Sequence, residues 1–255
     1  MSKFIDKLNQ VSQAVLQPIG FRAERVAPKP KILIIASLAQ DNVDRLADYV
    51  AGADAGLLPI SNLSSGIITI KEMSQIVSDI PWGGWLRGIC RGGIKQKAKI
   101  DYDFLVFPAA KTSLAILQND KVGRILEAEA SLSEGSLRAA DELPVDAVLI
   151  AGELAKDSFL TWHHLITFQR FASLLAKPLL VPVPSGVTAN ELQVLWRVGV
   201  DGVIVEVGGD QSVERLRELR QAVDKLTFPW RYKGVKEEAL LPYTGGERGI
   251  AAEEE

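Results

Sequence analysis

Short apolar runs alternate with amphipathic segments along most of this chain. Each run is apolar at nearly every position, which is typical of parallel strands buried on both faces. The segments between the runs carry apolar residues at helical spacing. Between residues 31 and 227 we count eight such runs, which begin near Lys31, Ala55, Gly84, Asp103, Arg124, Val145, Pro178 and Gly202. Eight strand–helix repeats in this length predict a closed (β/α)8 TIM barrel, an α/β fold, rather than an open sheet.

The two ends of the chain differ from this repeat. Residues 1–20 predict an extra amphipathic helix, whose apolar face is made by Phe4, Leu8, Val11 and Val15. We expect it to plug or flank the bottom of the barrel; the alternative is a helix that binds a membrane surface or a partner. Residues 21–30 contain two prolines and predict a linker. The segment 228–255 has no periodicity, so we expect an irregular extension whose last ten or so residues are disordered.

Two sequence patterns predict where helices begin. Thr69-x-x-Glu72 and Thr188-x-x-Glu191 both have the form of a capping box, in which the threonine and the glutamate satisfy each other's backbone N–H groups. The residues that follow each box are apolar at helical spacing. We therefore expect one helix to begin near each threonine.

Composition excludes several classes of protein. A net charge of −3 and an isoelectric point near 5.6 leave no basic surplus for neutralising nucleic-acid phosphates. One cysteine, Cys90, excludes an internal disulfide. No apolar run reaches the roughly 18 residues that a bilayer requires, and no secretory signal opens the chain. The sequence therefore predicts a cytoplasmic protein with no membrane or nucleic-acid partner.

Polar residues stand where the predicted strands end, which is where (β/α)8 barrels carry their chemistry. These residues are Ser37, Ser61, Arg87, Lys111, Glu127, Glu129, Glu153, Ser185 and Glu206. So much charge at a barrel mouth needs a ligand, a metal ion or an ion-pair network to balance it. Lys111 falls past Pro108 on the predicted loop, which favours a solvated lysine over a Schiff-base amine.

The acids and the arginine suggest two kinds of binding. Glu129 and Glu153 end neighbouring strands, and their carboxylates would suit Mg²⁺ or Mn²⁺; the alternative is a network with lysine or arginine. Glu127 has the same parity as Glu129 and points to the same face of its strand. Arg87 offers a planar fork for a carboxylate or phosphate, or else pairs with one of the glutamates.

Glycine features after the last two strands suggest an anion site. Ser185-Gly186 follows strand seven and Gly208-Gly209 follows strand eight, where backbone N–H groups often hold phosphate in this fold. The two histidines, His163 and His164, are adjacent on one predicted helix and point about 100° apart, so we expect structural or surface roles for them.

The run Trp85–Glu153 resembles the HpcH/HpaI aldolase and citrate-lyase-β group of pyruvate-binding barrels. The resemblance implies that Arg87 holds the substrate carboxylate, and that Glu129, in Glu127-Ala128-Glu129, and Glu153, after an apolar run and Gly152, hold the metal. The family's strand-two acid and histidine have no counterpart in the stretch from Leu57 to Ser64. The binding half of such a site is therefore kept and the proton-transfer half is missing.

Three functions follow as hypotheses. The first is a metal-assisted carbon–carbon lyase or aldolase acting on a small 2-oxo acid, with Glu127 or a metal-bound water as the base. The second is a non-catalytic binding or assembly protein, with the helix Trp162–Ala176 as a homo-oligomer face through Phe168, Phe171, Leu174 and Leu175. The third is an isomerase or lyase for phosphate esters. The first and third predict a small anionic metabolite as partner.

Overall fold

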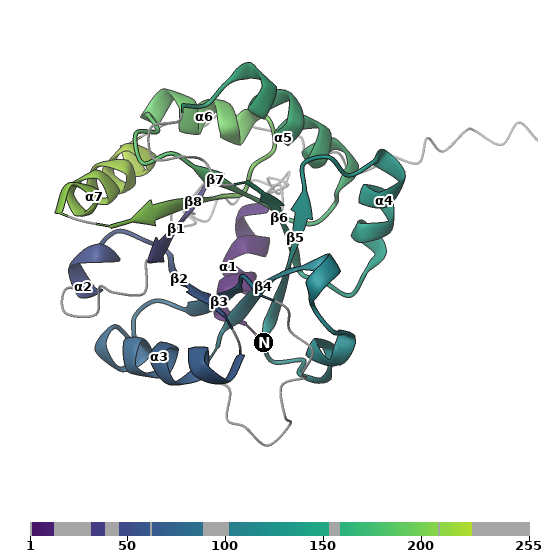
Figure 1. Cartoon of the computed structure of the whole chain (residues 1–255). Helices are drawn as coiled ribbons and strands as arrows, with labels where there is room; N and C mark the ends of the chain where they lie inside the picture. The colour runs from purple at the N-terminus through teal and green to yellow at the C-terminus, as the bar shows by residue number, and fades with distance from the viewer. Residues whose placement is uncertain are drawn as a thin grey trace, which may run out of the picture.

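The structure, a computed structural model, describes residues 2–12, 32–38, 46–61, 63–88, 102–152, 159–208 and 210–225. Within these ranges parallel strands pair in sequence order, and the last pairs with the first, so the sheet closes into a barrel (Figure 1). The strands are β1 (Leu33–Leu38), β2 (Ala55–Ile60), β3 (Trp82–Leu86), β4 (Phe104–Pro108), β5 (Gly123–Glu129), β6 (Ala147–Ala151), β7 (Leu179–Val183) and β8 (Gly202–Val207). The chain forms a (β/α)8 barrel, as the alternation of runs predicted.

Helices surround the barrel in Figure 1, and α1 is seen through the ring of strands because it lies at one end of the barrel. The α-helices among the described residues are α1 (Lys3–Ser12), α2 (Leu46–Tyr49), α3 (Leu63–Ile76), α4 (Glu134–Glu142), α5 (Trp162–Leu174), α6 (Ala189–Arg197) and α7 (Asp210–Lys225). The regular alternation fails after β4, where two 3₁₀ helices, η1 (Ala109–Lys111) and η2 (Leu114–Gln118), replace the expected α-helix. Thr112 and Ser113 between them are extended, and the Ser113 hydroxyl accepts a hydrogen bond from the Ala115 N–H, so the segment breaks into single turns.

One of the two predicted capping boxes is confirmed. At the start of α6, the Glu191 N–H donates to Thr188 Oγ1 and the Thr188 N–H donates to Glu191 Oε2. The other prediction is wrong, because Thr69 lies inside α3. That helix begins at Leu63, and its buried stripe already includes Gly66 ahead of Ile70 and Met73, at spacings of one turn.

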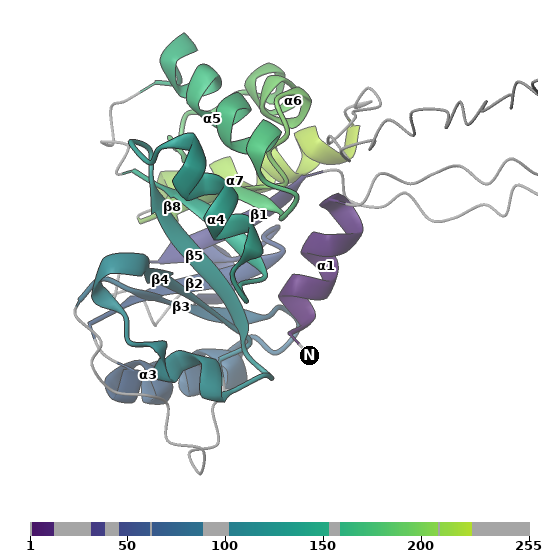
Figure 2. The ribbon, with the colours of Figure 1, turned by 90° about the vertical axis from the view of Figure 1, so that its right-hand side faces the viewer.

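The hydrophobic core has two layers. Outward-facing residues of the strands pack against the surrounding helices, whereas inward-facing residues such as Leu33, Ile35 and Ile125 fill the barrel. Helix α1 belongs to the inner layer, because Phe4, Ile5, Leu8 and Val11 are buried in the same cluster. Figure 2 shows α1 lying across one end of the barrel. This helix closes the bottom, the end at which the parallel strands begin.

Small residues at the bottom of the barrel make room for α1. At Gly123, the first residue of β5, an added Cβ atom would lie 2.4 Å from Cγ1 of Ile5 and 2.9 Å from the hydroxyl oxygen of Ser2. Both distances are shorter than any normal contact, so a larger residue would push the helix away. The ring of Phe4 then stacks on the ring of Phe104, with centroids 4.3 Å apart.

Four aspartates at the bottom stand directly before the even-numbered strands. Asp54, Asp146 and Asp201 each accept a hydrogen bond from a backbone N–H at the start of the preceding strand, donated by Ile34, Arg124 and Leu179 at 2.9, 2.7 and 2.8 Å. Asp103 instead caps α1, because its oxygens accept the backbone N–H groups of Lys3 and Phe4 and the Ser2 hydroxyl, each at 2.8 Å. Three of these carboxylates thus accept backbone N–H groups from barrel strands, and the fourth accepts those at the start of α1.

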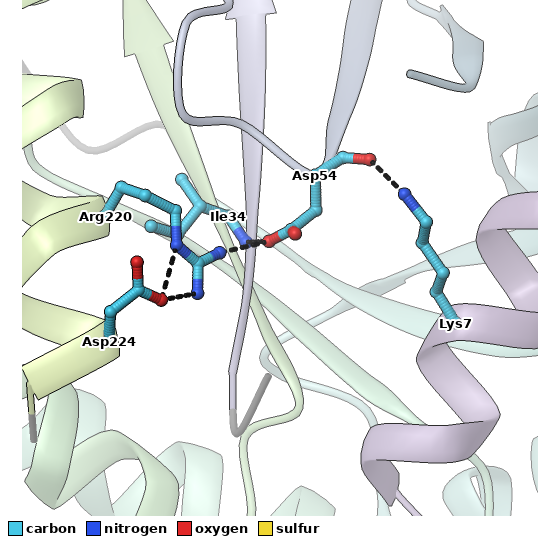
Figure 3. Close-up of polar contacts among 5 residues, drawn as sticks. All are labelled: Lys7, Ile34, Asp54, Arg220 and Asp224. Carbon is cyan, nitrogen blue, oxygen red and sulfur yellow. Dashed lines mark hydrogen bonds and ion pairs between the residues drawn. The ribbon is translucent and has the colours of Figure 1, made fainter. Parts of the chain in front are cut away.

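Asp54 also connects the first and last units of the barrel (Figure 3). Arg220 of α7 donates to its carboxylate at 3.0 Å and to Asp224 at 2.7 Å, while the Lys7 ammonium of α1 reaches the Asp54 carbonyl at 3.4 Å. Burial raises the pKa of Asp54 above its ordinary value, although the Ile34 N–H and Arg220 act in the opposite direction. A partly buried ion pair thus joins α7 to β1 and β2.

Several predictions lie outside the described residues. They include the linker 21–30, the end of the opening helix, the helix after β3 and the extension 228–255. Among the helices that the structure does describe, none is both long enough and apolar enough to cross a membrane.

Candidate functional site

A cavity of about 720 Å³ opens at the mouth of the barrel, where strands β2 to β6 end. This volume lies within the range of about 300–1,000 Å³ that small-molecule sites occupy. Charged side chains of both signs reach it. The lining residues are Pro59, Leu86, Arg87, Pro108, Ala109, Ala110, Lys111, Leu126, Glu127, Ala128, Glu129, Leu132 and Ala151. The fold therefore brings Arg87, Glu127 and Glu129 together at one cavity.

Arg87 directly follows β3, and its backbone N–H donates to the Ile60 carbonyl of β2 at 3.1 Å. Its side chain is exposed, and the guanidinium lies 3.7 Å from the centroid of the Trp85 ring. A guanidinium carries its N–H donors in its own plane, so contact with an aromatic face does not use those donors. The contact with Trp85 thus places the Arg87 guanidinium at the cavity wall.

Glu127 lies on β5, two strands away from β3, and is half-buried. Its Oε2 atom accepts a hydrogen bond of 3.0 Å from the indole N–H of Trp85. Trp85 itself is only 4% exposed and does not line the cavity. The carboxylate of Glu127 therefore has a defined orientation at the cavity wall.

Glu129 ends β5 in an exposed position, and its Oε2 atom accepts a hydrogen bond from the Ser131 hydroxyl at 3.3 Å. Its predicted partner in metal binding, Glu153, lies outside the described residues. Across the described part of the chain, no three His, Cys, Asp or Glu side chains come together as a metal site. The proposed Mg²⁺ or Mn²⁺ site stays a prediction.

The predicted anion site on loops seven and eight is separate from this cavity. Ser185, Gly186 and Gly208 are exposed but do not line it, and Gly209 lies outside the described residues. Arg215 of α7 holds the loop after β7 by donating to the carbonyls of Ser185, Gly186 and Val187, at 3.3, 3.3 and 2.9 Å. Among the described residues, apart from the chain neighbours of each glycine, no atom lies within 4 Å of a Cβ atom placed on Gly186 or Gly208. Open space thus adjoins both glycines.

Lys111, one of the residues expected at the mouth, ends η1; it is exposed as expected for a solvated lysine and lines the cavity. One residue of the site was not recognised as such in the sequence. Trp85 was read only as part of an apolar strand, and it contacts both Arg87 and Glu127. The signal for Trp85 was its spacing of two from Arg87, which places both side chains on the same face of an extended segment.

Helix α5 does not present the apolar face that was expected to join subunits. Phe168 and Phe171 are buried against the chain's own barrel at 4% and 0% exposure, because α5 packs there as an ordinary barrel helix. Its exposed apolar side chains are Trp162 and Ile166. Homo-oligomerisation stays a prediction, but the face of α5 proposed for it is buried within the chain itself at Phe168 and Phe171. His164 has the structural role expected, since its Nδ1 atom accepts the Thr161 N–H that begins the helix.

Comparison with known proteins finds the fold in solved structures. No family model matches the chain, and no curated protein matches it in sequence. Thiamine phosphate pyrophosphorylase from Pyrococcus furiosus is similar with a TM-score of 0.57 at 16% identity, over 76% of this chain and 96% of that one. A mutant tryptophan synthase α-subunit from the same organism has a TM-score of 0.55 at 15% identity, over 76% and 97%.

Orotidine 5′-phosphate decarboxylase from Pyrococcus horikoshii OT3 is also similar, with a TM-score of 0.52 at 11% identity, over 75% of this chain and 100% of that one. At these identities the likeness concerns the TIM-barrel fold alone. The relationship to HpcH/HpaI aldolases is not shown by these comparisons and stays a prediction.

Proposed function

We propose that this protein binds a small organic anion, a 2-oxo acid in the first instance, at the mouth of the barrel and acts on it as a carbon–carbon lyase. One observation carries the proposal: Arg87 and Glu127 contact the same buried Trp85 at the wall of a cavity of ligand size. A cation and a carboxylate are thereby held at separate places in one site. Lys111 adds a second positive charge to the cavity wall.

The chemistry assigned to each residue follows from its position. Arg87, with Lys111 beside the cavity, binds the carboxylate of the substrate through charge-assisted hydrogen bonds. Glu127 accepts the proton of the hydroxyl group on carbon 4 of a 4-hydroxy-2-oxo acid. The bond between carbons 3 and 4 then breaks, an aldehyde leaves, and the electron pair moves into the enolate of pyruvate. Return of the proton to carbon 3 completes the reaction.

A divalent ion belongs to this proposal as its Lewis acid. Mg²⁺ or Mn²⁺ held by Glu129 and Glu153 would stabilise the negative charge on the enolate oxygen. Glu129 supports this assignment because it is exposed and lies at the same cavity as Arg87 and Glu127.

Binding is tested first, by calorimetric titration of the wild-type protein with pyruvate in the presence of Mg²⁺. Arg87→Ala is expected to weaken pyruvate binding by at least about ten-fold, because it removes the main anion-binding group. Arg138→Ala is the matched control, since Arg138 is an exposed arginine of α4 that does not line the cavity. Equal affinities in the wild type and Arg87→Ala would disprove the assignment of this site.

Turnover separates a lyase from a binding protein. Release of pyruvate from 4-hydroxy-2-oxopentanoate is followed in a coupled assay. In Glu127→Gln, kcat is expected to fall by about a hundred-fold or more while the Kd for pyruvate stays within about two-fold. Pyruvate binding without any turnover in the wild type would favour the non-catalytic alternative.

A phosphate ester is the second candidate ligand. Its support is the exposed loop held by Arg215, with open space beside Gly186 and Gly208. Two of the similar barrels carry phosphate in their names, thiamine phosphate pyrophosphorylase and orotidine 5′-phosphate decarboxylase, although their likeness to this chain concerns the fold. Titration with inorganic phosphate should shift the amide signals of Gly186 and Gly208 in ¹H–¹⁵N spectra. Shifts confined to Arg87 and Lys111 would place phosphate in the first cavity instead.

A further inference from the structure

Trp85 makes two different contacts with the charged residues of the mouth. The guanidinium of Arg87 lies over the face of its ring, 3.7 Å from the centroid, and the carboxylate of Glu127 accepts from its N–H edge at 3.0 Å. The indole itself is buried within the inner core of the barrel. A packed ring of this kind has little freedom to rotate.

The chemistry of an indole explains why one ring holds groups of opposite charge. Its face carries negative charge density and attracts a cation, whereas its N–H is a donor without acceptor capacity and attracts an anion. Face and edge point in different directions. The ring therefore contacts Arg87 and Glu127 at two separate places, one on its face and one at its edge.

We propose that Trp85 is the positioning residue of this site, orienting Glu127 through its N–H and Arg87 through its ring face. This inference rests on the function proposed above. It assigns the two contacts to two steps: the N–H contact to proton transfer by Glu127, and the face contact to anion binding by Arg87. Trp85 does not line the cavity, so it acts through these two residues and not on the ligand.

Substitutions that remove one contact at a time test the assignment. Trp85→Phe removes the N–H but keeps an aromatic face, so kcat for 4-hydroxy-2-oxopentanoate should fall by at least about ten-fold with the Kd for pyruvate within about two-fold. Trp85→Leu removes both the N–H and the aromatic face, so kcat should fall and pyruvate affinity should also fall, by about five-fold or more.

Trp82 provides a matched control on the same strand. It is equally buried, at 2% exposure, and its indole N–H donates to the Val77 carbonyl at 2.9 Å, on the side that faces α3. Trp82→Phe and Trp82→Leu therefore remove a buried indole and its hydrogen bond without touching the mouth. Both are expected to leave kcat and Kd within about two-fold.

A spectroscopic measurement tests the N–H contact without any ligand. The chain has five tryptophans, and the indole N–H signal of Trp85 is assigned as the one that Trp85→Phe deletes. Glu127→Ala should shift this signal and speed its exchange with solvent, whereas Glu129→Ala should leave it unchanged.

The outcomes are separable. The assignment is supported if Trp85→Phe lowers kcat alone and Trp85→Leu lowers both kcat and pyruvate affinity, while the two Trp82 variants change neither. Equal effects of the Trp85 and Trp82 substitutions, or a Trp85 signal that is the same in the wild type and Glu127→Ala, would overturn it. If the wild type binds no pyruvate, the proposed function fails, and the indole signal then decides by itself whether Trp85 orients Glu127.

Discussion

The two ends of this barrel use carboxylates in opposite ways. At the bottom, Asp54, Asp103, Asp146 and Asp201 accept backbone N–H groups at 2.7–2.9 Å, and α1 covers the end of the barrel. At the mouth, Glu127 and Glu129 border a cavity of about 720 Å³. An acid that accepts backbone N–H groups stabilises the fold, whereas an acid at a cavity wall can contact a ligand.

This difference teaches how to read acids in a barrel sequence. An acid after an apolar run lies at the mouth, and an acid directly before one lies at the bottom, because the strands are all parallel. Substitutions at the two ends should therefore separate stability from ligand binding. The predictions below test that separation, from the largest expected effect to the smallest.

The largest effect is expected for Phe4→Ala in α1. Phe4 is fully buried and stacks on Phe104, so its removal leaves a cavity in the inner core and should lower the free energy of unfolding by about 3–5 kcal/mol. Urea unfolding followed by circular dichroism measures this. Trp162→Ala is the control, since Trp162 is 82% exposed and its loss should change stability by less than about 0.5 kcal/mol. A small effect of Phe4→Ala would show that α1 does not hold the bottom of the barrel.

Asp201→Ala should give the next largest effect. Asp201 is fully buried, and its loss deprives the Leu179 N–H of an acceptor, so we expect a loss of about 3 kcal/mol in the free energy of unfolding. Asp201→Asn keeps an oxygen acceptor in place and should cost about 1 kcal/mol. Pyruvate affinity, measured by calorimetry, should be unchanged in the folded variants. A strong loss of affinity would contradict the separation of the two ends.

Asp54 should give a smaller, pH-dependent effect. Burial raises its pKa above 3.8 in the folded protein, so the folded state holds this proton more tightly than the unfolded state does. The contribution of Asp54 to stability is therefore fully present below pH 3.8, and it is lost as the pH rises through the raised pKa of the folded state. Asp54→Asn cannot titrate. The difference in free energy of unfolding, wild type minus variant, should grow as the pH falls from about 7 toward about 4.

Urea unfolding of both proteins across this pH range provides the measurement. Groups that titrate equally in the wild type and the variant cancel in the difference. A difference that shrinks as the pH falls would mean that the ion pair with Arg220 outweighs burial.

The smallest effect on stability is expected for Glu129→Gln. Glu129 is exposed at the mouth, so the free energy of unfolding should change by less than about 0.5 kcal/mol. If Glu129 binds the metal as predicted, Mn²⁺ affinity measured by electron paramagnetic resonance should fall by at least about ten-fold. Glu134→Gln, an exposed acid in the first turn of α4, is the control. Equal Mn²⁺ binding in all three proteins would remove Glu129 from the metal site.

The sequence predicted some features of the site and missed others for identifiable reasons. Arg87, Glu127 and Glu129 were found because each stands at the end of an apolar run, and run ends mark the mouth in this fold. Trp85 was missed because its role depends on Glu127, which is 42 residues away in the chain and two strands away in the barrel. Asp54 was missed because it precedes a run, and its partner Arg220 is 166 residues away.

By itself the sequence determined the class of fold, since eight apolar runs separated by amphipathic segments can bury their surfaces as parallel strands covered by helices. It also predicted the helix start at the Thr188–Glu191 box, whereas the same pattern at Thr69–Glu72 lies inside α3. Only the tertiary structure decided the position of Trp85 between Arg87 and Glu127 and the seating of α1 against Gly123. These arrangements join strands and helices far apart in the sequence, and such contacts depend on register and space-filling, which a local pattern does not contain.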